Sequence, residues 1–110
     1  MFVVIWEYQV RAGCEAAFAA LYGAGGDWVA LFREFDGYIG TELLRDAADP
    51  LAHEPVKQDC ATRFVTIDRW ASQAAYDVFL TASEPRYAHI DARGDALTSA
   101  EHCLGRFRLE

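Results

Sequence analysis

The sequence predicts an α+β domain of the ferredoxin-like split β-α-β type, a four-stranded antiparallel sheet with its helices on one face. Strand-like and helix-like segments follow one another in the order β-α-β-β-α-β. Residues 2–8 (FVVIWEY) are echoed by residues 64–70 (FVTIDRW) in their pattern of apolar and aromatic positions. The chain has 110 residues and no linker-like stretch, so we expect residues 1–110 to form a single domain.

The first half of the chain predicts a strand, two helical segments and a second strand. Residues 2–10 are rich in β-branched and aromatic side chains, as in a strand covered on both sides. Residues 15–22 carry apolar side chains at helical spacing. After a glycine-rich break, Asp27 is a candidate N-cap for a second helical segment that bears an apolar stripe. Residues 38–46 have the composition of a second strand.

The second half predicts a long loop, a strand, helical segments and a last strand. Residues 47–61 are polar and contain two prolines, which is typical of an exposed loop, here an insertion. Residues 63–70 form the third predicted strand, and Ser72 is placed to cap a following helix. Pro85 is expected at the first position of another helical turn, and residues 102–109 end the chain as a short strand.

The echo between the first and third strands suggests how they lie in the sheet. We expect them to be central neighbours that run parallel, with equivalent positions side by side. Glu7 would then approach Arg69.

Period-2 alternation in these two strands predicts two different sheet faces. Trp6, Tyr8, Asp68 and Trp70 fall on one face, which we expect the helices to cover. The opposite face carries valines and isoleucines, and the chain has no further helix to cover it, so it is too apolar to remain in water. We therefore expect a homodimer in which a second subunit covers this open sheet face.

Composition and charge exclude several classes of function. The net charge of −7 repels nucleic-acid phosphates, so no nucleic-acid partner is expected. No apolar run approaches the roughly 20 residues that span a bilayer, and no basic segment precedes the first apolar residues, so a cytoplasmic protein without a membrane partner is expected. The three cysteines are widely spaced, and no zinc, phosphate-loop or nucleophile-elbow motif is present.

Three blocks of sequence carry a family resemblance. FVVIWEYQVRAG (residues 2–13), GYIGTELLRD (37–46) and RFVTIDRWAS (63–72) resemble, in this order, domains of the antibiotic biosynthesis monooxygenase family. The resemblance covers nearly the whole chain except residues 47–61. It implies that two four-stranded sheets pair into a dimeric α/β barrel, with a cavity between each sheet and its own helices. The family's commonest mark, a tryptophan that ends the third strand, is matched by Trp70.

The resemblance implies cofactor-independent oxidation of a small aromatic, polyketide-like substrate. The substrate would be deprotonated to an anion that reacts directly with O2, which requires a base and hydrogen-bond donors within aromatic walls. We expect no cofactor and no metal. The candidate substrate-binding residues are aromatic side chains, any of which could instead be core: Trp6, Tyr8, Trp28, Phe32, Tyr76 and Tyr87.

The candidate catalytic residues are Asp68, Trp70 and His89. Burial among apolar neighbours would raise the pKa of Asp68 toward that of a usable base, although an arginine or a backbone donor could instead pair with it. His89 lies in the segment that often closes the cavity in the family, where a histidine could act as a base or ligand, but a surface position is the alternative.

Two other functions stay open. A haem-degrading branch of the family is similar in Trp70 and in a histidine near His89, but it has a first-strand asparagine where this chain has Trp6. An indole cannot make the hydrogen bonds of that asparagine and would fill space that a porphyrin requires. A non-catalytic dimeric protein that binds small molecules is the other alternative, because this fold by itself implies no reaction.

Overall fold

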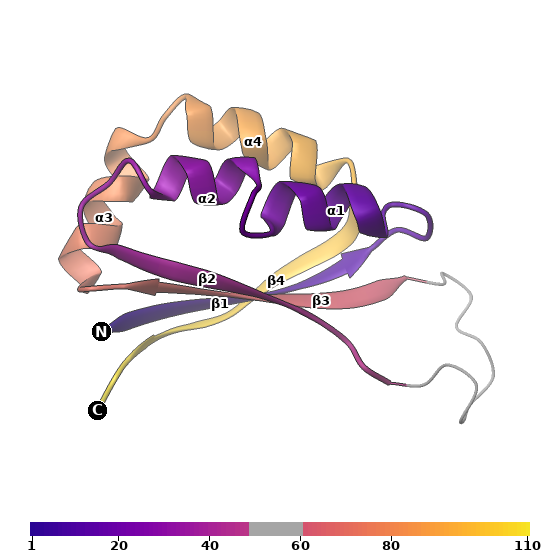
Figure 1. The fold of residues 1–110 in the computed structure, drawn as a ribbon, viewed down its shortest axis with the longest axis horizontal. Coiled ribbons are helices and arrows are strands. Elements are labelled where there is room, and N and C mark those ends of the chain that lie inside the picture. The colour runs from indigo at the N-terminus through magenta and orange to yellow at the C-terminus, as the bar shows by residue number, and fades with distance from the viewer. Residues whose placement is uncertain (49–60) are drawn as a thin grey trace.

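The protein forms one four-stranded sheet with all of its described helices on one face, as a computed structural model shows (Figure 1). The structure describes residues 1–48 and 61–110. The strands are β1 (Phe2–Val10), β2 (Tyr38–Arg45), β3 (Thr62–Trp70) and β4 (Thr98–Arg108). The helices are α1 (Glu15–Tyr22), α2 (Asp27–Phe32), α3 (Gln73–Ala82) and α4 (Arg86–Asp95). This α+β, ferredoxin-like architecture confirms the predicted fold class.

The sheet order is β2-β3-β1-β4, with antiparallel pairing throughout. The expectation that β1 and β3 run parallel is therefore wrong. The helical crossover returns the chain so that β2 runs parallel to β1, and β3 then inserts between them and is antiparallel to both. Glu7 lies opposite Val65 rather than beside Arg69. Instead, Glu7 forms an ion pair with Arg63 at 3.7 Å, and Arg69 forms one with Glu42.

The prediction of which residues share each sheet face still holds, because directly opposed residues in an antiparallel pair lie on the same face. Val4 lies opposite Asp68, and Phe2 lies opposite Trp70. Phe2, Val4, Asp68 and Trp70 are all buried beneath the helices. The open face, which carries the intervening odd-numbered residues of β1 and β3, has no helix against it (Figure 1).

The structure confirms one predicted helix cap and shifts the predicted start of three other elements. The Ser72 side chain accepts a hydrogen bond from the backbone N–H of Ala75 at 3.1 Å, as predicted for the cap of α3. Asp27 is the first residue of α2 rather than its cap, which is Gly26. Likewise Pro85 precedes α4 instead of starting it. The last strand begins at Thr98, earlier than expected, and the predicted loop at 47–61 lies almost wholly outside the described residues.

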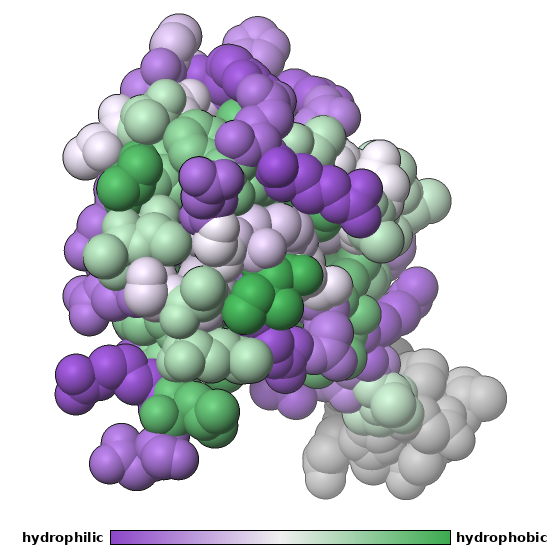
Figure 2. All heavy atoms as spheres, turned by 60° about the vertical axis from the view of Figure 1, so that its left-hand side comes forward, coloured by the Kyte–Doolittle hydropathy of each residue, from purple (hydrophilic) through white to green (hydrophobic). Residues whose placement is uncertain are grey.

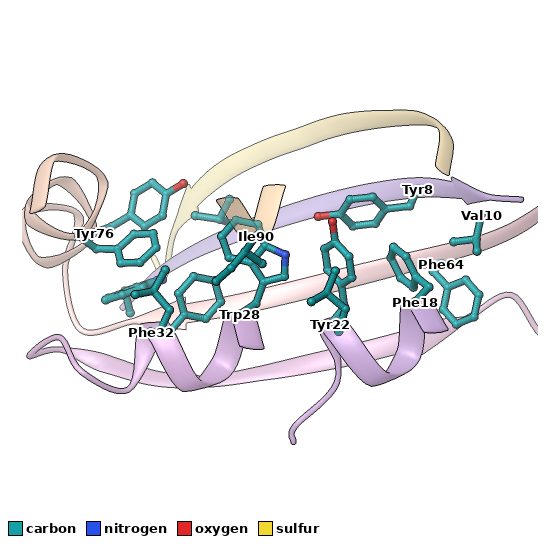
Figure 3. Packing of buried hydrophobic residues seen from close by; sticks show 14 of the residues in the cluster. Tyr8, Val10, Phe18, Tyr22, Trp28, Phe32, Phe64, Tyr76 and Ile90 are labelled. Carbon is teal, nitrogen blue, oxygen red and sulfur yellow. The ribbon is translucent and has the colours of Figure 1, made fainter. Parts of the chain in front are cut away.

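Aromatic side chains dominate the core between the sheet and the helices (Figure 3). Phe18 of α1 is fully buried, and its ring stacks on Tyr22 with centroids 4.1 Å apart. Trp70 is also fully buried and packs edge-on against Phe32, with ring centroids 5.7 Å apart. No helix in the described part of the chain has the length and apolar character needed to cross a bilayer.

Candidate active site

A small cavity lies between the helix-covered sheet face and the helices. Its volume is about 50 Å³, and it opens to solvent at one end. All four helices and all four strands contribute lining side chains, which are Trp6, Tyr8, Tyr22, Trp28, Phe32, Thr41, Thr66, Asp68, Tyr76, Phe79, Tyr87, Asp91 and Glu101. The walls are thus mostly aromatic, with a few polar groups among them.

Asp68 is the buried acid of this cavity. Its position on β3 turns it toward the helices, where its side chain is 9% exposed. Burial raises the pKa of Asp68 to about 6, because the charged carboxylate loses its hydration. None of the ion pairs formed within residues 1–48 and 61–110 includes it. A carboxylate kept in this state is a better proton acceptor than an exposed aspartate.

The partner of Asp68 is a hydroxyl group, neither the arginine nor the backbone donor considered as alternatives. Thr41 Oγ1 on β2 donates a hydrogen bond to Asp68 Oδ1 at 2.7 Å. Thr41 Oγ1 also lies 2.7 Å from the hydroxyl of Tyr38 on the same strand. This hydrogen bond to the carboxylate opposes part of the pKa increase caused by burial.

Phenol groups supply hydrogen-bond donors along the cavity. The hydroxyl ends of Tyr8 and Tyr22 point toward one another (Figure 3). Burial raises the pKa of Tyr8, Tyr22, Tyr76 and Tyr87 above the usual value for a phenol. These side chains therefore stay neutral and protonated at physiological pH, so each can donate a hydrogen bond to an anionic ligand.

Acidic side chains gather at the open end of the cavity. The carboxylate oxygens of Asp91, Asp95 and Glu101 all lie within 4.8 Å of one another. Partial burial, and then mutual repulsion, raises the pKa of Asp91 and of Glu101. Three carboxylates at this spacing have the donor chemistry to hold a hard cation, but exposed acidic groups are common without one.

The guanidinium of Arg106 lies 5.2 Å from the ring centroid of Tyr76.

The structure brings together most of the side chains singled out from the sequence. Asp68 and the six aromatic candidates, Trp6, Tyr8, Trp28, Phe32, Tyr76 and Tyr87, line one cavity. Trp70 does not line it but packs directly behind three residues that do, namely Phe32, Tyr76 and Phe79. Its indole nitrogen is buried without a hydrogen-bond partner among the described residues.

The structure places His89 elsewhere. It is exposed on α4 and lines a separate surface groove between α2 and α4, together with Ala30 and Ile90. It is not among the residues that line the cavity. The placement corresponds to the surface alternative considered for this histidine, and His89 therefore does not supply the ligand that the haem alternative required of it inside the cavity.

Several lining residues were missed by reasoning from sequence. Thr41 faces the cavity because it lies opposite Asp68 in the β2–β3 register. That register could not be read from sequence, because residues 46–61, rather than a two-residue turn, separate the two strands in the chain. Asp91 and Glu101 lie between the helical turn expected after Pro85 and the strand expected at 102–109, a stretch for which the sequence predicted no element.

Comparison with known proteins identifies the family of the chain. The model of the antibiotic biosynthesis monooxygenase family matches residues 1–93. The chain belongs to this family. No curated protein matches the chain.

Solved structures of similar fold include monooxygenases. A mutant of SnoaB, a cofactor-independent oxygenase from Streptomyces nogalater, has a TM-score of 0.73 at 19% identity, covering 98% of this chain and 91% of SnoaB. The monooxygenase from the gene ActVA-Orf6 of Streptomyces coelicolor, in complex with Nanaomycin D, has a TM-score of 0.67 at 19% identity, with 99% and 87% covered. Rv0793 from Mycobacterium tuberculosis has a TM-score of 0.63 at 21% identity, with 99% and 95% covered. At these identities the antibiotic biosynthesis monooxygenase fold is what the likeness establishes.

Proposed function

We propose that this member of the antibiotic biosynthesis monooxygenase family oxidises a small polycyclic aromatic compound with O2 and without a cofactor. The observation that carries the proposal is the buried Asp68 carboxyl, which has no cationic partner among the described residues and lines a cavity with aromatic walls. The family and the cofactor-independent oxygenase of similar fold support it.

Each chemical requirement of such a reaction has a candidate group in the cavity. The Asp68 carboxylate removes a proton from an acidic C–H of the substrate, and neutral phenols such as Tyr8 and Tyr22 donate hydrogen bonds to the resulting anion. The electron-rich anion then reduces O2 and combines with it to form a peroxide. Loss of water leaves a carbonyl group, so that CH2 and O2 become C=O and H2O.

The cavity must widen before such a substrate can enter. Its volume of about 50 Å³ is well below the roughly 300 Å³ at which ligand pockets usually begin. Trp6 and Tyr87 line it and are only half-buried, so they have the freedom to move outward. A shift of these two side chains would open the cavity while the fully buried layer around Trp70 stays in place.

We also propose that a second copy of the chain covers the open sheet face. Ile5 and Ile67 are only half-buried there, and they lie opposite one another in the β1–β3 register. Leu44 and Phe107 extend the apolar surface to both edge strands and are 45% and 49% exposed. Figure 2, in which the α3 end of the molecule faces the reader, shows hydrophobic side chains at the surface among hydrophilic ones, including below the helical layer.

Oxygen consumption tests the activity. Purified protein with anthrone, a tricyclic compound with an acidic CH2 group, should consume O2 faster than buffer alone. Asp68→Asn should slow this by about 100-fold or more, the usual contribution of a general base. Asp77→Asn is the matched control, because Asp77 is exposed on α3 and does not line the cavity. Equal rates in the parent and Asp68→Asn would refute the assignment of the base. Substrate binding without O2 consumption would favour the non-catalytic alternative.

The dimer is tested by sedimentation. The parent should sediment as a dimer at micromolar concentration, and Ile67→Lys should convert it to a monomer by placing a charge in the centre of the covered face. A parent that sediments as a monomer would refute this part of the proposal.

A further inference from the structure

Two hydroxyl groups link the buried carboxyl of Asp68 to the edge of the sheet. Thr41 Oγ1 donates to Asp68 Oδ1 at 2.7 Å, which uses the single proton of the threonine hydroxyl. The hydroxyl of Tyr38, also 2.7 Å from Thr41 Oγ1, must then be the donor of that second hydrogen bond. The three groups therefore form one continuous chain with a single direction of donation, from Tyr38 to Thr41 to Asp68.

This chain has an inner end and an outer end. Thr41 lines the cavity and also lines a second pocket of about 310 Å³ on the outer side of β2 and α2. Tyr38 lines this second pocket and not the cavity, and Arg33 and Val29 of the α2 region line the pocket with it. Tyr38 is half-buried, so the hydrogen-bonded chain begins in the cavity and ends at a pocket open to solvent.

We propose that Thr41 and Tyr38 form a proton path between Asp68 and solvent in this second pocket. The inference rests on the proposed function, in which a bound aromatic substrate fills the cavity and separates Asp68 from water at the open end. When the ionised carboxylate of Asp68 takes a proton from the path, Thr41 gives its proton to Asp68, Tyr38 gives its proton to Thr41, and water gives one to Tyr38. When the protonated carboxyl group releases a proton, both hydroxyl groups first turn so that donation runs from Asp68 to Thr41 to Tyr38, and Tyr38 then releases a proton to water. Each hydroxyl accepts one proton and loses one, so no charge remains on the path.

Deuterium exchange into the substrate separates the path from the oxidation. Without O2, Asp68 can remove a proton from the CH2 group of anthrone, exchange it for a deuteron from D2O, and return the deuteron to the same carbon. The parent protein should therefore accelerate deuterium incorporation above the rate in buffer. Exchange requires the path, whereas oxidation does not, because both hydrogens lost from the CH2 group leave in the water that is formed.

Tyr38→Phe is the decisive variant, because it removes only the hydroxyl at the outer end of the path. Deuterium incorporation should fall at least about tenfold, a conservative fraction of what a proton-transfer group contributes. Aerobic oxidation should fall by a clearly smaller factor than deuterium incorporation does. Equal losses in both assays would show a merely structural role for Tyr38, and no loss in either would show that protons reach Asp68 by another route. Both results would overturn the proposal.

A matched pair at Thr41 provides the second test. Thr41→Ser keeps the hydroxyl and should retain exchange, whereas Thr41→Val keeps the shape and should lose it. Exchange that is the same in the serine and valine variants would contradict the path.

A measurement on ligand-free protein keeps the two proposals distinguishable. If the parent neither oxidises anthrone nor exchanges its protons, the proposed function fails for this substrate class. The hydroxyl chain is then judged by the titration of the Asp68 carboxyl carbon in NMR spectra. Loss of the Tyr38 hydroxyl weakens donation by Thr41 and so raises the pKa of Asp68. An identical titration in the parent and in Tyr38→Phe would overturn the chain whatever substrate the protein uses.

Discussion

Replacing Asp68 by asparagine should remove a pH-dependent loss of stability between acid and neutral pH and also remove the proposed activity. The pKa of Asp68 is raised from 3.8 to about 6 by burial. Between these values the folded state binds more protons than the unfolded state, so stability falls as pH rises through this window. A shift of about two units corresponds to about 3 kcal/mol, which is fully lost above about pH 7 and retained below about pH 3.

Asparagine has nearly the same shape as aspartate and cannot ionise, and its side-chain oxygen can still accept the hydrogen bond from Thr41. Its amide N–H groups lack an assured partner, which costs about 1–3 kcal/mol at any pH. The comparison is therefore the change in unfolding free energy between about pH 4 and pH 8, because a pH-independent cost cancels in that difference.

Urea unfolding at fixed protein concentration gives this difference. Over this range the parent should lose about 2–3 kcal/mol more than Asp68→Asn, allowing for incomplete titration at the ends. The titratable groups that interact with Asp68 or share its cavity include the phenols Tyr8, Tyr38 and Tyr76 and the acids Asp91 and Glu101. The three phenols have raised pKa values and stay neutral within the range, and the titration of Asp91 and Glu101 is common to both proteins and cancels in the comparison. The same pH dependence in both proteins would refute the argument that Asp68 is buried without charge compensation.

Other perturbations test the packing and the proposed reaction. The rate of anthrone oxidation should rise with pH through about 6 and level off above about 7 as Asp68 becomes fully ionised; a rate that falls over this range would contradict its role as a base. Phe18→Ala should cost about 3–5 kcal/mol of unfolding free energy, because Phe18 is fully buried, and a loss below about 1 kcal/mol would show that the site collapses to fill the cavity. Gly37→Ala should cost about 1–2 kcal/mol, since Gly37 has a φ of +90° and an added Cβ would lie 2.6 Å from the Cβ of Ala75; Gly25→Ala, in open space, should be nearly neutral in the same urea assay.

The elements whose patterns are local were predictable from the sequence. The side chains of residues 2–10 and 63–70 indicate both strands, and the period-2 rule predicts the face that holds Trp6, Tyr8 and Asp68, which all line the cavity. The direction of β3 relative to β1 was not predictable from their similar sequences, because similarity between two segments carries no information on direction. Only the order of connections settles it.

Polar contacts across the sheet were harder to foresee. The hydrogen bond between Thr41 and Asp68 joins residues 27 positions apart and depends on the β2–β3 register. A single-residue slip in that register would turn Thr41 to the opposite face. His89 shows the reverse difficulty, because α4 is mostly polar and few large apolar side chains mark its inner face, so the position of a histidine between them is hard to assign.

Because β2 lies at the edge of the sheet, the proposed base is on a central strand while its hydrogen-bond donor is on an edge strand. Asp68 lies on β3, which is hydrogen-bonded on both sides, whereas Thr41 and Tyr38 lie on a strand that has a neighbour on one side only. Edge strands open locally at lower free energy than the centre of a sheet, so brief fraying of β2 would separate Thr41 from Asp68 without disturbing β1 or β3. In those moments Asp68 loses its hydrogen-bond donor. The frequency of local opening of β2, which amide exchange measures, would then set how often the Asp68 carboxylate changes from a weaker to a stronger base.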